Sequence, residues 1–500
     1  MPQMSAGLVA QLDVRAAVAA ETKWEPDLLP QPLVDRFAAD RVDLVSEHIE
    51  QLALDDEAFR SCDLLIAHKW TYGRRPVALV PFRERVLYRA TVEKIKPYLP
   101  PVVRGDEAYR TFKQAPTSRG NDISHVVTTD IANFYSSIPI DQLGQHLKGR
   151  AGHFELITWL ENFWREISGR YVGIPQVNEA SETVAEAYAD DLQRRILARG
   201  VTSVRYSDDF RLLTLGDKRA VRALEIFDDE ARQLGLHVNE RKTRTDSISD
   251  YTDWFQASPN LQGPVARARD AFIDRDLYSD STFEPDEAQE HRDTATEMLN
   301  LWSSGSREYQ EGEARAEVVR HAKTALGLLE TIEDPTAIPW CEAIVRTEPQ
   351  LTPAVARYLR TLESRHHERV SSALESLVIY LPLSQWQRVW MLYVIEVGGF
   401  LTDNAVIDWA KSNTKDANSE FLRAYSAWVL ACNHRLEDST WREAANGSTS
   451  LTSPYLAGAL ANCRGFSSTE KAQLVAPNFL DQQLFEWVVH NEEDIIPPIF

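Results

Sequence analysis

The stretch that most constrains this chain is Tyr206-Ser207-Asp208-Asp209, where two adjacent carboxylates lie between segments rich in valine, leucine and aromatic residues. This pattern predicts two short strands joined by a tight turn at the acidic pair. Aspartate tolerates the left-handed backbone of such turns, so we expect both carboxylates at an exposed tip. A divalent cation best relieves repulsion between neighbouring carboxylates, which makes the turn a candidate metal site.

A second candidate metal ligand is Asp130, which ends a predicted strand over residues 123–129. A strand fixes its terminal carboxylate while leaving the end of the strand open to a ligand. An Asp-Asp turn alone is most often a solvated loop. The metal interpretation therefore depends on Asp130 and the acidic pair coming together from two strands that end side by side.

The composition is that of an ordinary globular protein, with 43% hydrophobic and 26% charged residues. A chain of 500 residues exceeds what one hydrophobic core usually serves, so we expect two or three domains. The first residues lack a basic segment ahead of an apolar run, which predicts neither a signal peptide nor a membrane anchor. The four cysteines show no CxxC spacing, which gives little support for a zinc site. So few cysteines fit a protein of the reduced cytoplasm.

The net charge of −21, taken alone, argues against a nucleic-acid partner, because phosphate binding needs Lys and Arg. Its distribution changes that conclusion. Residues 1–250 carry 33 Lys and Arg against 38 Asp and Glu, whereas residues 251–500 carry 21 against 37. Residues 51–150 are basic, with 15 against 11, and they lie just upstream of the acidic motifs. A basic stretch beside metal-binding carboxylates is what a nucleotide site requires.

Helical and strand patterns divide the chain into four segments. We expect a helical N-terminal extension over residues 1–60, a mixed domain over 61–250, a proline-containing connection over 251–285 and an α-helical repeat domain over 286–500. The last segment has no titratable constellation, so its default role is interaction or scaffolding. Its predicted helices cover 286–303, 311–332, 353–376, 384–398, 417–433 and 479–490.

Arginines surround a strand-like segment, Pro76–Pro81, with Arg75 on one side and Arg85 on the other. Such arginines can grip triphosphate oxygens through bidentate hydrogen bonds, although a solvated surface is the simpler interpretation of the segment by itself. A second basic patch includes Arg110.

Four motifs then follow in a specific order: DIANFYSSI at 130–138, GIPQ at 173–176 with a serine five residues after the glutamine, YSDD, and GLHVNERKT at 235–243. This order resembles motifs A to D of the reverse transcriptase palm, and the arginine-rich segment before them resembles the fingers. The resemblance covers roughly residues 65–250. It is specific because the order of four motifs is far rarer than any one of them.

The resemblance implies a role for each matching residue. The metal ligands for Mg²⁺ or Mn²⁺ match Asp130, Asp208 and Asp209, and Lys242 matches a proton donor to pyrophosphate. Tyr135 matches the aromatic gate that favours deoxynucleotides. The remaining nucleotide- or template-side candidates are Gln176, Ser181, Arg75, Arg85 and Arg110. One departure is Val177, since reverse transcriptases usually have glycine after the motif B glutamine.

A palm followed by a long helical region is similar to the abortive-infection and defence-associated reverse transcriptases of bacteria. That resemblance implies an α+β fold of fingers and palm followed by an all-α HEAT-like repeat domain. It also implies an antiphage DNA polymerase that uses dNTPs, makes DNA with or without a template, and in some members attaches the product to a protein hydroxyl. Aromatic residues in the helical half are candidate anchors of a homo-oligomer.

Two alternatives remain open on the sequence. One is a template-copying reverse transcriptase that uses a bound non-coding RNA. The other is a non-catalytic scaffold that binds nucleic acid or protein. Retention of the clustered carboxylates favours catalysis, because an unused cluster of like charges is a stability liability.

Overall fold

The computed structural model describes residues 4–23, 28–54, 62–69, 73–169, 171–256, 285–308, 312–397, 404–491 and 495. The chain forms two compact units. We call the first the sheet unit: Met1–Trp24, Arg41–Cys62 and Val80–Ala257. We call the second the helical unit: Glu25–Asp40, Asp63–Leu79 and Ser258–Phe500. The units are therefore not consecutive segments, unlike the predicted four-part order.

The sheet unit is built on one antiparallel sheet of four strands in the order β4-β5-β3-β6. The strands are β3 (His125–Asp130), β4 (Thr202–Tyr206), β5 (Asp209–Thr214) and β6 (Arg244–Ser247). The strand predicted over 123–129 is β3, and the strands predicted around the acidic pair are β4 and β5. Placing β5 beside β3 brings the end of β3 next to the β4–β5 turn.

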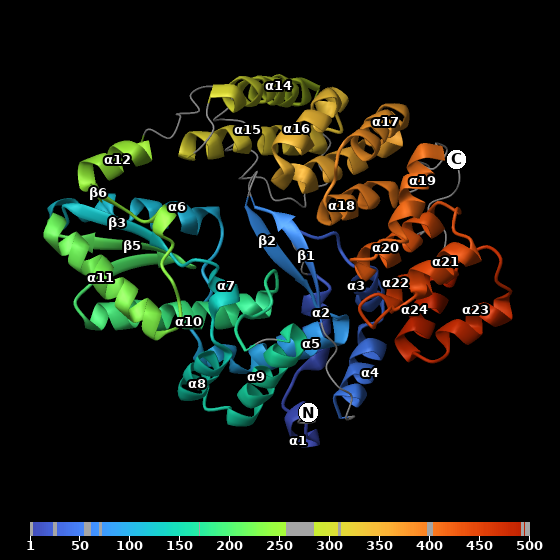
Figure 1. Ribbon diagram of the computed structural model, residues 1–500, viewed down its shortest axis with the longest axis horizontal. Helices are drawn as coiled ribbons and strands as arrows, with labels where there is room; N and C mark the ends of the chain where they lie inside the picture. The colour runs from blue at the N-terminus through green and yellow to red at the C-terminus, as the bar shows by residue number, and fades with distance from the viewer. Residues whose placement is uncertain are drawn as a thin grey trace. The chain divides into compact units, whose positions relative to one another are not determined.

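Helices cover both faces of this sheet (Figure 1). On one face, Phe210 of β5 packs edge-on against Phe227 of α11 (Asp217–Gln233), with the ring centroids 4.9 Å apart. On the other face, Leu213 joins a buried cluster with Tyr251 of α12 (Ile248–Gln256). Strand β5 is consequently buried on both sides, which fixes the position of the turn that precedes it.

The other helices of the sheet unit pack around this core. A buried ion pair joins two of them, because Glu21 of α2 accepts from Arg85 and Arg89 of α5. The helices are α1 (Ala6–Val9), α2 (Val14–Glu21), α4 (Val42–Leu54), α5 (Phe82–Ile95), α6 (Asp106–Gln114), α7 (Phe134–Ser137), α8 (Ile140–Ala151), α9 (Phe154–Ser168) and α10 (Glu179–Ala198).

The helical unit contains every helix predicted beyond residue 286 and several that were not predicted. The predicted helices are α14 (Pro285–Glu308), α15 (Gly312–Thr331), α17 (Thr352–Tyr380), α18 (Gln385–Ile395), α20 (Glu420–Cys432) and α24 (Phe479–His490). Sequence periodicity did not predict five short helices, because two to three turns give little periodicity. They are α16 (Cys341–Thr347), α19 (Asn404–Asn413), α21 (Asp438–Ala445), α22 (Ser453–Leu460) and α23 (Ser468–Val475). A HEAT-like repeat remains a prediction. The predicted connection over 251–285 is partly helical, since α12 reaches Gln256, and residues 257–284 lie outside the described part.

Two N-terminal elements belong to the helical unit: α3 (Leu33–Asp40) and an antiparallel hairpin of β1 (Asp63–His68) and β2 (Arg74–Leu79). The strand predicted at 76–81 is β2, two residues earlier, and its partner β1 was not predicted. One face of the hairpin is buried, and β1 packs on α18. The basic hairpin therefore groups with the helices rather than with the palm-like sheet.

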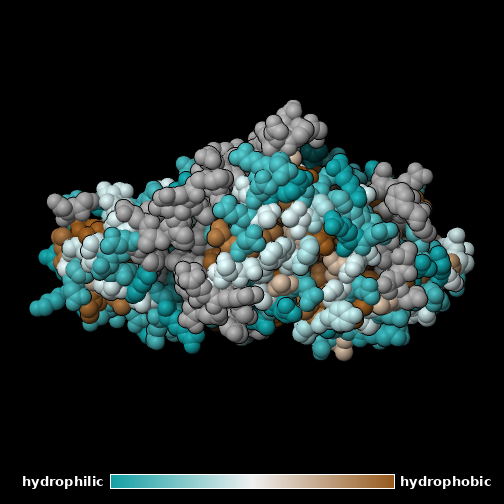
Figure 2. Space-filling view, turned by 90° about the horizontal axis from the view of Figure 1, so that it is seen from above, coloured by the Kyte–Doolittle hydropathy of each residue, from teal (hydrophilic) through white to brown (hydrophobic). Residues whose placement is uncertain are grey.

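Among the described residues, no helix combines the length and apolarity needed to cross a membrane. On the face shown in Figure 2, hydrophobic residues are scattered among hydrophilic ones. Scattered apolar residues are normal for a protein surface.

A buried carboxylate, Glu396, ties α3 into the helical unit. It pairs with Arg36 of α3 and with Arg360 of α17, and it accepts hydrogen bonds from Tyr425 (2.9 Å) and Trp428 (2.8 Å). Burial by itself would raise the pKa of Glu396, but the two arginines and the hydrogen bonds lower it to about 2. The ionised form is thus strongly favoured in the folded protein.

We predict that Glu396→Gln lowers the free energy of unfolding of the helical unit by about 3 kcal/mol at pH 7, because it leaves two partly buried guanidinium groups without their buried counter-charge. The folded pKa lies below the ordinary value, so this contribution is complete above about pH 4.5 and is lost as the pH falls towards 2. Urea unfolding of the wild type and Glu396→Gln at pH 7 and pH 3 measures the difference in free energy of unfolding. Glu443→Gln, in an exposed pair with Lys415, is the control. Equal stability of wild type and Glu396→Gln at pH 7 would contradict the prediction.

Candidate metal and nucleotide site

The β4–β5 turn consists of Ser207 and Asp208, with Tyr206 and Asp209 paired across it. The left-handed residue is Ser207, with φ +56°, and not an aspartate as the sequence predicted. The expectation of an exposed tip is also wrong, because Asp208 and Asp209 are both half-buried. The reason is that other segments of the sheet unit pack around the turn.

Asp130 meets this turn from the neighbouring strand. It lies directly opposite Asp209 in the β3–β5 register, and the amide of Ile131 donates to the carbonyl of Asp208 at 3.3 Å. The structure thus brings together the three aspartates chosen from the sequence. Antiparallel pairing is the cause, since it places the end of β3 beside the beginning of β5.

The two carboxylate oxygens of Asp130 have different surroundings. Oδ2 contacts the ammonium group of Lys242 and accepts from the Asn239 side chain at 3.2 Å. Oδ1 is buried and has no hydrogen-bond partner within the described structure. Asn239 also donates its amide to the Asp130 carbonyl at 2.8 Å, which holds the Lys242 segment against β3. Asn239 was missed by the sequence analysis, since its part depends on a contact between distant segments.

Burial and charge repulsion act together on Asp208. Burial, together with the negative charges of Asp130 and Asp209, raises the pKa of Asp208 to about 6. Burial lowers the pKa of Lys242, but the hydrogen bond and the charge of Asp130 outweigh it, so the net shift is upward. The ammonium of Lys242 therefore stays protonated at neutral pH while one carboxylate beside it is destabilised.

These residues fit a divalent cation. An unpaired, buried carboxylate oxygen and a raised carboxyl pKa are both relieved by a bound cation. Within the described residues, no group of three or more His, Cys, Asp and Glu side chains is arranged as a complete metal-binding set. Mg²⁺ does not need one, because it is usually held by one or two carboxylates with water and substrate phosphates. Asp130, Asp208 and Asp209 are the residues that would hold it.

Tyr135 and Gln176 are brought to one place by the loop before α10. The amide of Ile174 donates to the Tyr135 carbonyl at 3.0 Å, and the Gln176 side chain donates to Ser136 at 3.1 Å. Gly173 allows this approach, because a Cβ there would lie 3.2 Å from a backbone oxygen. Burial, Glu182 and Asp208 raise the pKa of Tyr135 to about 12 despite a nearby arginine. The tyrosine is thus electrostatically linked to the aspartates.

Ser181 lies elsewhere. It is fully buried in α10, and its hydroxyl pairs with Tyr88 at 2.9 Å. The N-cap of α10 is Asn178, whose side chain accepts from the Ser181 amide at 3.3 Å. The structure therefore places Ser181 in helix packing rather than on an open surface.

The three predicted triphosphate arginines have separate surroundings. Arg85 is 11% exposed and is paired with Glu21. Arg75 lies on β2 in the helical unit, and Arg110 is exposed on α6. From a distant segment, the structure brings Arg104 to the aspartate turn, where it contacts Ser207 at 3.4 Å. Arg104 lies just before Gly105, the N-cap of α6, and carries no distinctive pattern in the sequence.

Val177 has a left-handed backbone, with φ +59°. A β-branched residue rarely adopts this conformation, since its side chain collides with the backbone. Val177 therefore has the backbone conformation that glycine favours, but it adds a branched side chain directly beside Gln176.

We predict that Asp208→Asn stabilises the metal-free protein by about 1–2 kcal/mol at pH 7.5, because it removes a repelled charge. The folded pKa of about 6 exceeds the ordinary carboxyl value, so the penalty of ionisation grows as the pH rises from about 4 and is complete above 6. The gain should vanish near pH 4. Added Mg²⁺ should stabilise the wild type more than the variant.

Chemical denaturation with and without Mg²⁺ tests this prediction. Asp228→Asn is the control, because Asp228 is partly exposed on α11 and pairs with Arg232 one turn away. A variant that is less stable than the wild type at pH 7.5 without metal would refute it.

The comparisons with known proteins address the same region. Residues 67–256 match the family described as "Reverse transcriptase (RNA-dependent DNA polymerase)". No curated protein matches the chain. Among solved structures, the chain is similar to telomerase from Candida tropicalis in complex with the TWJ fragment of telomeric RNA. The identity is 11%, the match covers 70% of this chain and 67% of that chain, and the TM-score is 0.31.

The family match begins within β1 and ends at the last residue of α12, so it contains Asp130, the acidic turn and Lys242. The geometry of the aspartates and the family match agree on the same segment. Residues 67–256 of this chain are a reverse transcriptase-type polymerase domain.

Proposed function

We propose that this domain is catalytic and transfers deoxynucleotides to a hydroxyl group, either the 3′-hydroxyl of DNA or a hydroxyl of a protein. The observation that carries the proposal is the meeting of Asp130, Asp208 and Asp209 across β3 and β5, with one buried oxygen of Asp130 unpaired. Divalent metal bound there supplies Lewis-acid activation of the attacking hydroxyl and neutralises the phosphates.

The chain's own residues have distinct parts in this proposal. Lys242 carries a proton at neutral pH and would give it to the leaving pyrophosphate from Nζ, which lies beside Asp130. Tyr135 presents its ring near the aspartates and would exclude a ribose 2′-hydroxyl. Gln176 is held beside it by Ser136 and would orient the nucleotide.

Val177 bears on whether a template is copied. Its strained backbone shows that the position tolerates the conformation of glycine, yet a branched side chain stands next to Gln176. Such a side chain takes space that a template base would otherwise use. We therefore favour synthesis without a template, with product attached to a protein hydroxyl, over copying of a bound non-coding RNA.

The central experiment incubates the purified protein with labelled dNTPs and Mg²⁺, without primer or template. We predict labelled DNA that becomes protein-free only after protease treatment. Asp208→Ala should reduce incorporation about a thousandfold, or about 4 kcal/mol of barrier, because a metal ligand is lost. Asp228→Asn should incorporate like the wild type.

Two outcomes would oppose this proposal. Equal incorporation by the wild type and Asp208→Ala would show that the aspartates are not the site. Loss of synthesis after nuclease pretreatment of the protein would favour the template-copying alternative, since only templated synthesis needs a bound nucleic acid.

We also propose an antiphage role, which rests on the resemblance of the motifs and of the helical region to defence-associated reverse transcriptases. In a host that carries the gene, we predict that Asp130→Asn abolishes a reduction in phage plating that the wild type produces, while protein levels stay equal. Undiminished protection by Asp130→Asn and by Asp208→Asn would instead support the non-catalytic scaffold.

A further inference from the structure

Two arginines from different segments bind the turn that carries Asp208. Arg205 of β4 donates from Nη1 to the carbonyl of Ser207 at 3.0 Å, and Arg104 donates from Nη2 to the Ser207 hydroxyl at 3.4 Å. Ser207 is the left-handed residue of the turn. A non-glycine residue in that conformation persists only when its surroundings hold it. The two arginines are those surroundings.

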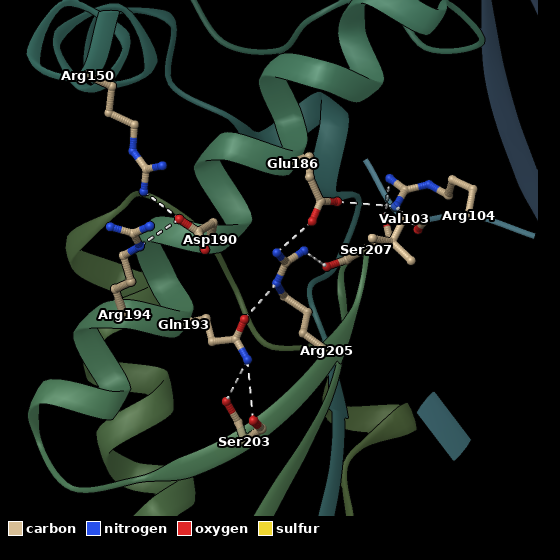
Figure 3. Close-up of polar contacts among 10 residues, drawn as sticks. All are labelled: Val103, Arg104, Arg150, Glu186, Asp190, Gln193, Arg194, Ser203, Arg205 and Ser207. Carbon is tan, nitrogen blue, oxygen red and sulfur yellow. Dashed lines mark hydrogen bonds and ion pairs between the residues drawn. The ribbon is translucent and has the colours of Figure 1, made fainter. Parts of the chain in front are cut away.

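Both arginines meet on one carboxylate, Glu186 of α10 (Figure 3). Oε1 accepts from Arg205 at 2.6 Å and Oε2 accepts from Arg104 at 3.2 Å. The Glu186 side chain is 7% exposed and the Arg205 side chain 8%. Since each oxygen holds one guanidinium, a movement of either arginine breaks a buried, charge-assisted hydrogen bond.

Arg104 extends this network to the proposed sugar-contacting residue. Its guanidinium lies 5.7 Å from the ring centroid of Tyr206, and its positive charge acts on Tyr135, where it opposes the rise in pKa that burial causes. The next amide, that of Gly105, donates to the Tyr206 hydroxyl at 3.2 Å. One cation therefore binds the turn expected to hold metal and acts electrostatically on the residue expected to exclude ribose.

The helix that supplies Glu186 is itself firmly placed. Its neighbours in α10 include Val184, Ala187 and Tyr188, all fully buried. One further contact fixes the strand, because Gln193 of the same helix donates to Ser203 and accepts from Arg205, each at 3.3 Å. Glu186 is thus attached to a rigid helix and reaches out to two movable side chains.

We propose that Glu186 is a positioning residue that aligns the proposed metal turn with Tyr135 through Arg104 and Arg205. It touches neither metal nor nucleotide. Its effect is geometric, because Asp208 directly follows the serine that the arginines hold, and a misplacement of about 1 Å at a reacting centre can cost about a hundredfold in rate. This inference rests on the proposed polymerase function.

A matched control lies on the same helix. Asp190, about one turn further along α10, also joins two arginines, Arg150 and Arg194, and has no contact with the aspartate turn (Figure 3). Asp190→Asn therefore removes a carboxylate of the same kind from α10 without touching the turn. Asp190→Asn should leave both the affinity for Mn²⁺ and the preference for dNTPs over rNTPs unchanged.

The test measures Mn²⁺ affinity by electron paramagnetic resonance without nucleotide, and then dNTP against rNTP incorporation. We expect Glu186→Gln to weaken Mn²⁺ binding about tenfold, to lower kcat for dNTPs about 10- to 100-fold and to reduce discrimination against rNTPs. A purely structural role would lower stability but leave the affinity and the sugar preference of the folded fraction intact.

Arg205→Lys keeps the positive charge and the fold but loses the fork that joins Ser207 to Glu186. If Glu186→Gln does not fold, Arg205→Lys decides by the same two readouts. Wild-type Mn²⁺ affinity and sugar preference in the folded variants would overturn the proposal, as would an equal loss in Asp190→Asn. If the wild type binds Mn²⁺ but incorporates no nucleotide, the proposed function fails, and the metal affinities still decide the role of Glu186.

Discussion

The meeting of three aspartates in a half-buried turn is the constraint around which the sheet unit is arranged. Asp130 and Asp209 face each other across β3 and β5, and Asp208 adjoins them. The pKa of the Asp208 carboxyl is raised. Such an arrangement costs stability without a cation. The fold holds it by burying β5 on both faces and by fixing the turn at Ser207 from the side.

Buried carboxylates in this protein fall into two kinds. Glu396 and Glu186 each bridge two arginines, with both oxygens occupied, and each stabilises a junction between distant segments. Asp130 differs, because Oδ1 has no partner in the described structure. Fully paired carboxylates hold the fold, whereas an incompletely paired one can still accept a ligand. Asp63 and Asp246 also have a buried oxygen without a hydrogen-bond partner among the described residues, so what marks Asp130 as part of the site is its meeting with the acidic pair.

The hairpin of β1 and β2 gives the arginine-rich segment a different context from the one expected. It packs on α18 of the helical unit, although the chain on both sides of it belongs to the sheet unit. The triphosphate role of Arg75 stays a prediction. Arg104, which the sequence analysis passed over, bonds to the Ser207 hydroxyl of the metal turn and acts electrostatically on Tyr135.

The sequence by itself determined the strands that carry Asp130 and the acidic pair, the longer helices, and the motif order that identifies the polymerase domain. These depend on local periodicity and on spacing along the chain, which are visible in any single sequence. Only the tertiary structure decided that Ser207 takes the left-handed position, that Ser181 is buried, and that Glu186, Arg104 and Arg205 converge on the turn. Those facts arise from contacts between segments up to about a hundred residues apart, and no local pattern encodes which distant side chain will satisfy a buried charge.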